Sequence, residues 1–232
     1  MAAAVGQSGA ILMTSQANSR NAILDRARAL ATATLGDALD AHGVAGVMSG
    51  IVRRTGSGRI AGYAQTMQEQ VGPFGSFEFK DFAVGPAFDA ASKDTVLVVD
   101  MGSADVSTFG GLAALTLQMR QAAGAVVDGG CRDIEEIAQI GLTVASRSVT
   151  PRTGKGRLRI VSRGEPVTCG GVSVRQDDLV VADDTGIAVI PQNRIEAVLQ
   201  TAEEFDRRDA EFAERLRKGE SFAKAASSLK HA

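Results

Sequence analysis

The spacing of hydrophobic positions predicts that the chain begins with two helices. Over residues 19–31 apolar side chains recur every three or four positions, which is the period of one helix face. A second, shorter helix is predicted from Thr34, which opens a Thr-x-x-Asp capping-box spacing, to the region of Gly43, which suits a helix end. Residues 1–18 are small and polar and predict a loosely held tail, so we expect a single domain over residues 19–232.

The pattern in the middle of the chain predicts a strand–helix–strand unit. The β-branched run TVLVVD at 95–100 is continuous, as in a strand that is buried on both faces. A glycine-rich turn and a helix at 112–124 follow, and AVVD at 125–128 predicts the next buried strand. Upstream, RIAGYAQTM at 59–67 predicts a strand. The Gly/Phe-rich segment 71–86 predicts a packed loop or, alternatively, a flap over a site.

Polar residues follow both strands of this unit, in two predicted turns. Gly102–Gly111 follows the first strand, and Gly129–Asp133 follows the second, where Arg132 and Asp133 open a further helix. Ligands of open α/β sheets bind preferentially at the carboxyl ends of strands. The Arg132–Asp133 pair is therefore expected where a small molecule would bind, although a helix start alone also favours an Asp near the positive end of its dipole.

Short strands predominate beyond residue 140. Strands are predicted at 142–146, 158–162 and 171–174, and the segment 178–191 predicts a hairpin that turns at Asp-Asp-Thr-Gly. A long helix over roughly 193–218 closes the pattern. The sequence as a whole therefore predicts an α/β fold.

Two features of this half have more than one interpretation. Arg157 and Arg159 alternate with apolar residues, which is most simply the solvent-facing side of a strand and alternatively an RNA-binding face. In the last helix, Asp209 occupies the apolar seam, where a carboxylate is costly without a partner. One interpretation is that Asp209 forms an ion pair with Arg208 or Arg215. The other is that it reaches into a metal or substrate site, which can lie across a subunit interface.

Composition narrows the class of protein. The 232 residues are 44% hydrophobic and 22% charged, and the net charge of −2 favours neither nucleic acid nor an anionic membrane as the main partner. No apolar run reaches the roughly 20 residues that span a bilayer, so a cytoplasmic protein is expected. Cys131 and Cys169 have no metal-like spacing, and His42 and His231 lie at a helix end and in a tail. None of these four residues is expected to be a metal ligand.

Arg132 and Asp133 suit one kind of chemistry if they share a pocket. A guanidinium group binds a carboxylate through a fixed fork of donors, and a single Asp with open positions can anchor Mg²⁺ or Mn²⁺. The N–H groups at the start of the helix at Leu112 add an anion site. Together these groups predict a site for a 2-oxo acid, in which an enolate would be stabilised. Lysines are sparse, so a Schiff-base mechanism has no obvious nucleophile.

The chain resembles one known family over about residues 20–222. The segments that carry the resemblance are GDALDAHGVAG, TFGGLAAL, GAVVDGGCRDIEEI, PVTCGGVSVRQDDLVVADDTGIAVIP and RLRKGE. The family contains the 4-hydroxy-4-methyl-2-oxoglutarate/4-carboxy-4-hydroxy-2-oxoadipate aldolases and the regulator of ribonuclease activity A. The resemblance implies a swivelling β/β/α-type fold of stacked sheets and flanking helices, assembled as a homotrimer or as a dimer of trimers.

The aldolases of that family are divalent-metal class II pyruvate aldolases that also decarboxylate oxaloacetate. By this resemblance, Arg132 would bind pyruvate and stabilise its enolate, and Asp133 would hold Mg²⁺. The N–H groups of Leu112 and Ala113, which follow Gly111, would cradle the pyruvate carboxylate.

The resemblance also implies a contribution from a second subunit. An acidic residue on the last helix of a neighbouring subunit completes the aldolase site. Asp209 is the nearest match for this acid, and Glu211 is the alternative.

One position departs from the aldolase pattern. The aldolases carry Asp or Glu about twenty residues before the Arg, directly after a glycine, whereas this chain has Gly110 and Gly111 there. Such an acid could hold a water or assist proton transfer, and Asp105, in the same predicted turn, could replace it. We expect a metal-dependent lyase that cleaves a 4-hydroxy-2-oxo acid or decarboxylates oxaloacetate. The alternative is a non-catalytic binding protein like the ribonuclease regulator, with a ribonuclease as its partner.

Overall fold

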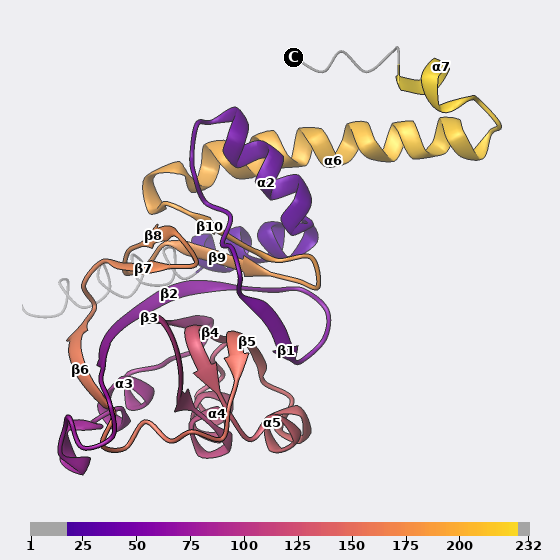
Figure 1. Ribbon diagram of the computed structural model, residues 1–232. Coiled ribbons are helices and arrows are strands. Elements are labelled where there is room, and N and C mark those ends of the chain that lie inside the picture. The colour runs from indigo at the N-terminus through magenta and orange to yellow at the C-terminus, as the bar shows by residue number, and fades with distance from the viewer. Residues whose placement is uncertain (1–17, 227–232) are drawn as a thin grey trace, which may run out of the picture.

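The computed structural model describes residues 18–226. Its main sheet has eight strands: β1 (Val52–Thr55), β2 (Ile60–Val71), β3 (Thr95–Phe109), β4 (Gly124–Cys131), β5 (Thr143–Val149), β6 (Leu158–Arg163), β9 (Leu179–Ala182) and β10 (Ile187–Ile190). They lie in the order β1-β5-β4-β3-β2-β9-β10, and β6 pairs with the second half of β2. A bridge between Val47 and Ala188 joins the segment before β1 to β10, so the curved sheet is nearly closed (Figure 1).

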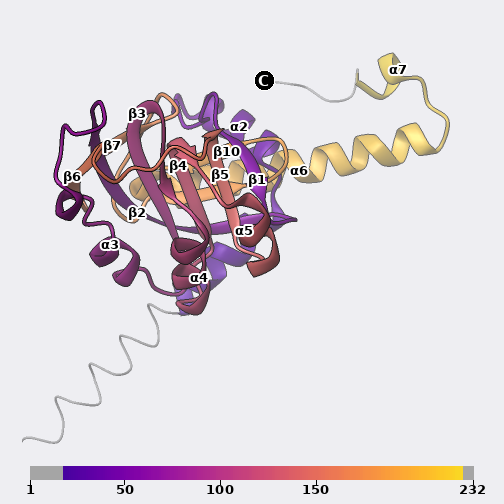
Figure 2. The same ribbon diagram turned by 60° about the horizontal axis from the view of Figure 1, so that its bottom comes forward.

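Helices pack on both outer sides of this sheet. They are a helical segment over residues 18–29, α2 (Thr32–Ala41), α3 (Gly85–Asp89), α4 (Gly111–Met119), α5 (Ile134–Ile140), α6 (Ile195–Arg217) and α7 (Phe222–Ala226), with short 3-10 turns η1 (Phe79–Asp81) and η2 (Gln192–Arg194). The segment 18–29, α2 and the first half of α6 cover β9 and β10, whereas α3, α4 and α5 cover the side formed by β3, β4 and β5 (Figure 2). The predicted fold class, an α/β domain with flanking helices and a long last helix, is confirmed.

The predicted strand–helix–strand unit is present and continues into a second one. β3, β4 and β5 are parallel neighbours, and α4 and α5 connect them. Along β3, Leu97 and Val99 pack against the helices, whereas Val96 and Val98 pack in the interior of the curved sheet. Burial on both faces thus explains why the run of apolar residues is uninterrupted.

The two predicted turns of this unit are instead largely parts of strands. β3 continues to Phe109, so the predicted turn Gly102–Gly111 is mostly strand, and β4 continues through Gly129 and Gly130. Gly102 and Ser103, which have left-handed backbone conformations, interrupt the pairing of β3 with β4 but do not end it. The glycines of β4 serve close packing, because a Cβ atom at Gly130 would approach the carbonyl oxygen of Val106 to 2.7 Å.

Helix α2, the second of the two helices predicted at the start of the chain, begins two residues before the predicted capping box. α2 starts at Thr32, and its cap comes from far along the chain: the carboxylate of Asp183 accepts hydrogen bonds from the Thr32 N–H group (2.9 Å) and hydroxyl group (2.5 Å). Asp183 lies in the turn of the predicted hairpin, which β9 and β10 form. His42 follows the last residue of α2, as expected, and its Nε2 atom bonds to Thr201 of α6 at 2.9 Å.

A small hairpin, β7 (Val167–Cys169) and β8 (Val172–Val174), closes the interior of the curved sheet. Asp128 of β4 joins the hairpin to the sheet, since it accepts hydrogen bonds from the Gly170 N–H group (2.7 Å) and from Nε of Arg147 (2.5 Å). Burial works to raise the pKa of Asp128, but these hydrogen bonds outweigh it and lower the pKa. Cys131 and Cys169 are both buried and free.

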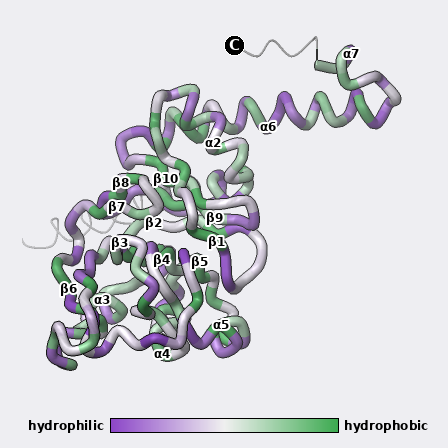
Figure 3. Tube along the Cα trace, viewed as in Figure 1, coloured by the Kyte–Doolittle hydropathy of each residue, from purple (hydrophilic) through white to green (hydrophobic). Residues whose placement is uncertain are grey.

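The second half of α6 projects from the body of the chain and carries both hydrophilic and hydrophobic positions (Figure 3). Asp209 is exposed on this half. The ion pair considered for it is absent, because Arg208 lies 3.8 Å from Glu204 and Arg215 lies 2.7 Å from Glu220. The side chain of Asp209 has no hydrogen bond or ion pair with any of residues 18–226, so the internal ion pair is not formed.

The predicted tail falls almost entirely on residues 1–17, which lie outside the described residues, as does His231. In the part that is described, no helix has both the length and the apolar character needed to cross a membrane.

Candidate active site

A cavity of about 460 Å³ lies at the carboxyl ends of β3 and β4, next to the first residues of α4 and α5. Its lining residues are Phe82, Val84, Phe88, Ser107, Thr108, Phe109, Gly110, Leu112, Ala113, Arg132, Asp133, Glu136, Thr153 and Lys155. The structure therefore brings Arg132 and Asp133 together in one cavity, at the sheet edge where the sequence placed them.

The side chain of Arg132 forms one ion pair and no hydrogen bond within the described residues. Its backbone N–H group bonds to the carbonyl oxygen of Phe109 (3.0 Å), which fixes the residue between the ends of β3 and β4. Its Nε atom lies 3.4 Å from Oδ2 of Asp133, and the side chain is 44% exposed. It makes no hydrogen bond with any residue in the described range, so its fork of donors is available to an anionic ligand.

Asp133 connects the starts of two helices. It precedes α5 in a left-handed conformation (φ 58°, ψ 39°), which costs a non-glycine residue about 1 kcal/mol. Its Oδ2 atom accepts a hydrogen bond from the N–H group of Gly111 at 3.1 Å, whereas Oδ1 has no partner among the described residues. Gly110 makes this approach possible, because a Cβ atom there would lie only 2.5 Å from the same Oδ2.

The start of α4 offers two unused backbone donors. The N–H group of Gly111 is engaged by Asp133, but those of Leu112 and Ala113 have no acceptor within residues 18–226. Both residues line the cavity. Unpaired N–H groups at a helix start favour an anion, so they can hold a carboxylate beside Arg132.

Glu136 lies where a side chain of residue 111 would begin. A Cβ atom added to Gly111 would collide with Oε2 of Glu136, a residue of the first turn of α5 that also lines the cavity. Its carboxylate has no hydrogen-bond partner in the described part of the chain. The site therefore contains a carboxylate at this edge although residue 111 is a glycine. The available signal was its position three residues after Asp133, on the same side of one helix turn.

Asp105, which the sequence offered as a replacement for the missing acid, does not take that place. It lies in β3, is exposed, and does not line the cavity. Its carboxylate accepts a hydrogen bond from the hydroxyl group of Ser148 (2.7 Å) and lies 3.9 Å from the guanidinium group of Arg152. Because β3 extends beyond the expected turn, the side chain is directed to other partners.

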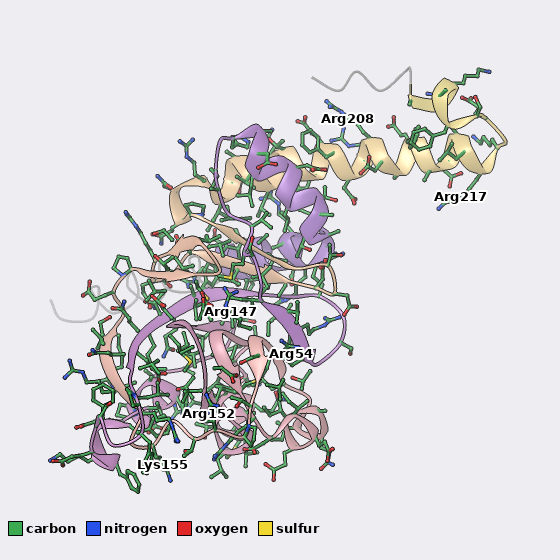
Figure 4. The ribbon with its side chains drawn as sticks, viewed as in Figure 1. Arg54, Arg147, Arg152, Lys155, Arg208 and Arg217 are labelled. Carbon is green, nitrogen blue, oxygen red and sulfur yellow. The ribbon has the colours of Figure 1, made fainter. Side chains whose placement is uncertain are left out.

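The other wall of the cavity comes from the Gly/Phe-rich segment. Phe82 and Val84 of the predicted loop and Phe88 of α3 line it and form an apolar wall. Lys155, on the segment between β5 and β6, adds an exposed positive charge on the side of the sheet that α4 covers (Figure 4). The cavity thus has cationic side chains from two separate segments and an apolar wall.

The carboxylates of the cavity fit a hard divalent cation. Within the described range no three His, Cys, Asp or Glu side chains gather as a metal site. Asp133, through its unpartnered Oδ1, and Glu136 are the carboxylates among the residues that line the cavity. Mg²⁺ typically takes one or two protein carboxylates and fills its other positions with water and substrate, so two carboxylates at an open cavity suit it. Asp209 does not belong to this set, because α6 lies on the other side of the sheet (Figure 1).

Comparison of the sequence with known proteins assigns the chain to a family. The family model RraA-like (Aldolase/RraA) matches residues 32–189. A Halalkalibacterium halodurans protein named "Putative 4-hydroxy-4-methyl-2-oxoglutarate aldolase" is 32% identical over 180 residues, which cover 75% of this chain and 79% of that protein. Protein DlpA of Legionella pneumophila is 30% identical over 169 residues, which cover 72% of this chain but 27% of DlpA. The chain thus spans about a quarter of DlpA.

A solved structure shows the same fold. Streptomyces coelicolor RraAS2, described as an unusual member of the RNase ES inhibitor RraA protein family, matches with a TM-score of 0.71 and 25% sequence identity. The match covers 83% of this chain and 95% of that one. The chain is therefore similar both to a protein named for an aldolase activity and to one named for ribonuclease inhibition.

Proposed function

The chain belongs to the RraA-like family (Aldolase/RraA), and from this premise we propose that it is a lyase that forms pyruvate with the help of a divalent cation. Its reaction is the retro-aldol cleavage of a 4-hydroxy-2-oxo acid, the decarboxylation of oxaloacetate, or both. The observation that carries this proposal is the half-exposed guanidinium group of Arg132, which forms an ion pair with Asp133 in one cavity but no hydrogen bond with the described residues.

The chain's own residues hold the 2-oxo acid. The N–H groups of Leu112 and Ala113, together with Arg132, bind its carboxylate. The positive charge of Arg132 also stabilises the enolate oxygen as negative charge grows there. In the retro-aldol direction, the carboxylate of Glu136 accepts the proton of the 4-hydroxyl group, which a positioned general base can do.

In this proposal Asp133 would hold the Mg²⁺ or Mn²⁺ ion, and Glu136 stays free to act as the base. When bound, the ion supplies a Lewis acid for the keto oxygen. The hydrogen bond from the Gly111 N–H group fixes the carboxylate of Asp133 and leaves Oδ1 free.

A second cation in the cavity supports a substrate with two acidic groups. Lys155 lines the cavity, as do the apolar side chains of Phe82 and Val84. A 4-hydroxy-2-oxo dicarboxylic acid or oxaloacetate could place its second carboxylate at Lys155.

Assembly is part of the proposal. A homotrimer or a dimer of trimers would allow Asp209 or Glu211 of the projecting helix to complete the site of a neighbouring copy. The alternative function, a non-catalytic binding protein with a ribonuclease as its partner, rests on the similarity to RraAS2.

A turnover assay distinguishes the two functions. Oxaloacetate decarboxylation is followed with Mg²⁺ or Mn²⁺ and with EDTA, for the parent, Arg132→Ala and the control Arg152→Ala, which removes a nearby exposed Arg that does not line the cavity. We expect metal-dependent turnover that falls at least about 100-fold in Arg132→Ala, as for loss of a transition-state charge contact, and little change in Arg152→Ala. Absence of turnover with either cation would favour the binding protein.

A further inference from the structure

Glu69 is a buried acid that the proposed mechanism leaves unused. It lies in β2, opposite Ile160 of β6, and only 5% of its surface is exposed. Its Oε1 atom accepts a hydrogen bond from the hydroxyl group of Thr108 at 2.6 Å. Its Oε2 atom is the single buried side-chain nitrogen or oxygen atom without a hydrogen-bond partner among residues 18–226.

This environment favours the uncharged form of Glu69. An ionised carboxylate in the interior normally needs a cation or several donors, and Glu69 has one hydroxyl group. Burial raises the pKa of Glu69 to about 7, although the hydrogen bond from Thr108 lowers it. The charged residues of the two flanking strands are Asp100 and Asp105 of β3, and Arg159 and Arg163 of β6. None of these four forms a hydrogen bond or an ion pair with Glu69, whose partner is Thr108.

Thr108 connects Glu69 to the cavity. It lies near the end of β3, lines the cavity that contains Arg132, and is itself only 5% exposed. It also directly precedes Phe109 and Gly110, which lead into the unpaired N–H groups of α4. One residue therefore contacts a buried acid through its hydroxyl group and contributes to the wall of the site.

We propose that Glu69 is the internal acid of the site and delivers a proton to the bound product through the hydroxyl group of Thr108. This inference rests on the proposed function, because it needs the enolate of pyruvate. It concerns a residue outside the cavity, which acts through Thr108.

The proton transfer balances without any further reactant. When a C–C bond of the substrate breaks, its electron pair forms the enolate, and carbon 3 must then gain a proton. At rest the Thr108 hydroxyl proton is directed to Oε1 of Glu69. For the transfer the hydroxyl group turns to carbon 3 and gives this carbon its proton as a C–H bond forms, while the carboxyl proton of Glu69, carried on Oε1, passes to the Thr108 oxygen. Glu69 is left as a carboxylate and regains a proton from water before the next turnover. The reverse sequence removes a methyl proton from bound pyruvate.

The reverse sequence gives a direct measurement. Pyruvate is incubated with the full chain and Mg²⁺ in D₂O, and exchange of its methyl protons is followed by NMR between about pH 5.5 and 8.5. Removal of a methyl proton requires the carboxylate form of Glu69, so the exchange rate of the parent rises with pH through the pKa of about 7.

Four variants separate proton transfer from a structural role. Glu69→Gln keeps the shape but cannot ionise, and Thr108→Val removes the hydroxyl group, whereas Thr108→Ser keeps it. Thr66→Val is the matched control, since Thr66 is also buried on β2 but donates its hydroxyl proton to the carbonyl oxygen of Glu165 at 2.7 Å. Circular dichroism and the dissociation constant of pyruvate are measured for each variant.

We expect Glu69→Gln and Thr108→Val to exchange the methyl protons of pyruvate at least about tenfold more slowly than the parent does. This is a conservative value, because one acid–base group typically contributes more. In both variants the exchange rate should no longer rise near pH 7. Their dissociation constants for pyruvate should stay within about twofold of the parent's, as for an intact site. Thr108→Ser and Thr66→Val should resemble the parent.

Three other outcomes overturn the proposal. If Glu69→Gln exchanges like the parent while Arg132→Ala does not exchange, the proton comes from elsewhere and only the proposed function stands. If slower exchange is matched by equally weaker pyruvate binding and an unchanged pH profile, Glu69 merely positions Thr108. If the parent itself shows no exchange with bound pyruvate and Mg²⁺, the proposed function fails as well.

Discussion

The carboxylate of Glu136 lies where the side chain of residue 111 would begin, so that even a methyl group at Gly111 would collide with it. The two residues belong to different helices, α4 and α5, whose first turns meet at the cavity. An acid at this edge can therefore come from either position, but not from both at once. In this chain it comes from Glu136.

This relationship predicts a rescue between the two positions. Glu136→Ala should reduce turnover at least about 100-fold, the usual lower range for loss of a general base. Adding Gly111→Asp to that variant should raise its turnover again by at least about tenfold, because the new side chain enters the space that Glu136 vacates. Gly111→Asp alone should be impaired by the collision. Steady-state kinetics on the four proteins checks this, and a double variant no better than Glu136→Ala would contradict it.

The metal assignment predicts a selective loss of cation affinity. Asp133→Asn should weaken Mn²⁺ binding at least about tenfold, because the neutral amide is a poorer ligand for a hard cation. Asp105→Asn is the control, since Asp105 is exposed and paired with Ser148 and Arg152 outside the cavity. Isothermal titration with Mn²⁺ measures both. Equal affinities for the parent and Asp133→Asn would remove Asp133 from the metal site.

Glu69 predicts an unusual dependence of stability on pH. Its pKa is raised from 4.5 to about 7 by burial, so the folded state holds the proton more tightly than the unfolded state. The stability contributed by protonated Glu69 is present below about pH 4.5 and is lost as the pH rises through about 7. Between pH 5 and 8 the free energy of unfolding of the parent should fall by about 2–3 kcal/mol relative to Glu69→Gln. Urea unfolding at both pH values measures it, and parallel pH profiles of the two proteins would contradict a buried, titrating acid.

Much of the fold could be predicted because local patterns dictate it. The run at Thr95–Asp100 is apolar at every position but its ends, which predicts burial on both faces, and the turn at Asp183 marks the hairpin of β9 and β10. The lengths of β3 and β4 could not be predicted, because Gly129 and Gly130 look like a turn in sequence. Only the close approach of neighbouring strands shows why glycine is needed inside β4.

The site was predictable only in part, for a related reason. Arg132 and Asp133 are adjacent in sequence, so their shared location follows from one strand end. The proximity of Glu136 to Gly111 depends on how α4 and α5 pack, and the contact of Glu69 with Thr108 depends on the pairing of β2 with β3. Asp209 was placed on a packing face by periodicity, but α6 extends beyond the core that such a face would need.

The central claim, that one cavity holds a 2-oxo acid and a divalent cation together, is tested most directly by measuring pyruvate binding with and without Mg²⁺. Calorimetric dissociation constants are compared for the parent, Arg132→Ala and Asp133→Asn. Mg²⁺ should tighten pyruvate binding to the parent at least about tenfold, a coupling free energy of about 1.4 kcal/mol. Arg132→Ala should lose pyruvate binding, and Asp133→Asn should lose only the effect of Mg²⁺. Pyruvate affinity that is the same with and without Mg²⁺, or the same in all three proteins, would contradict the claim.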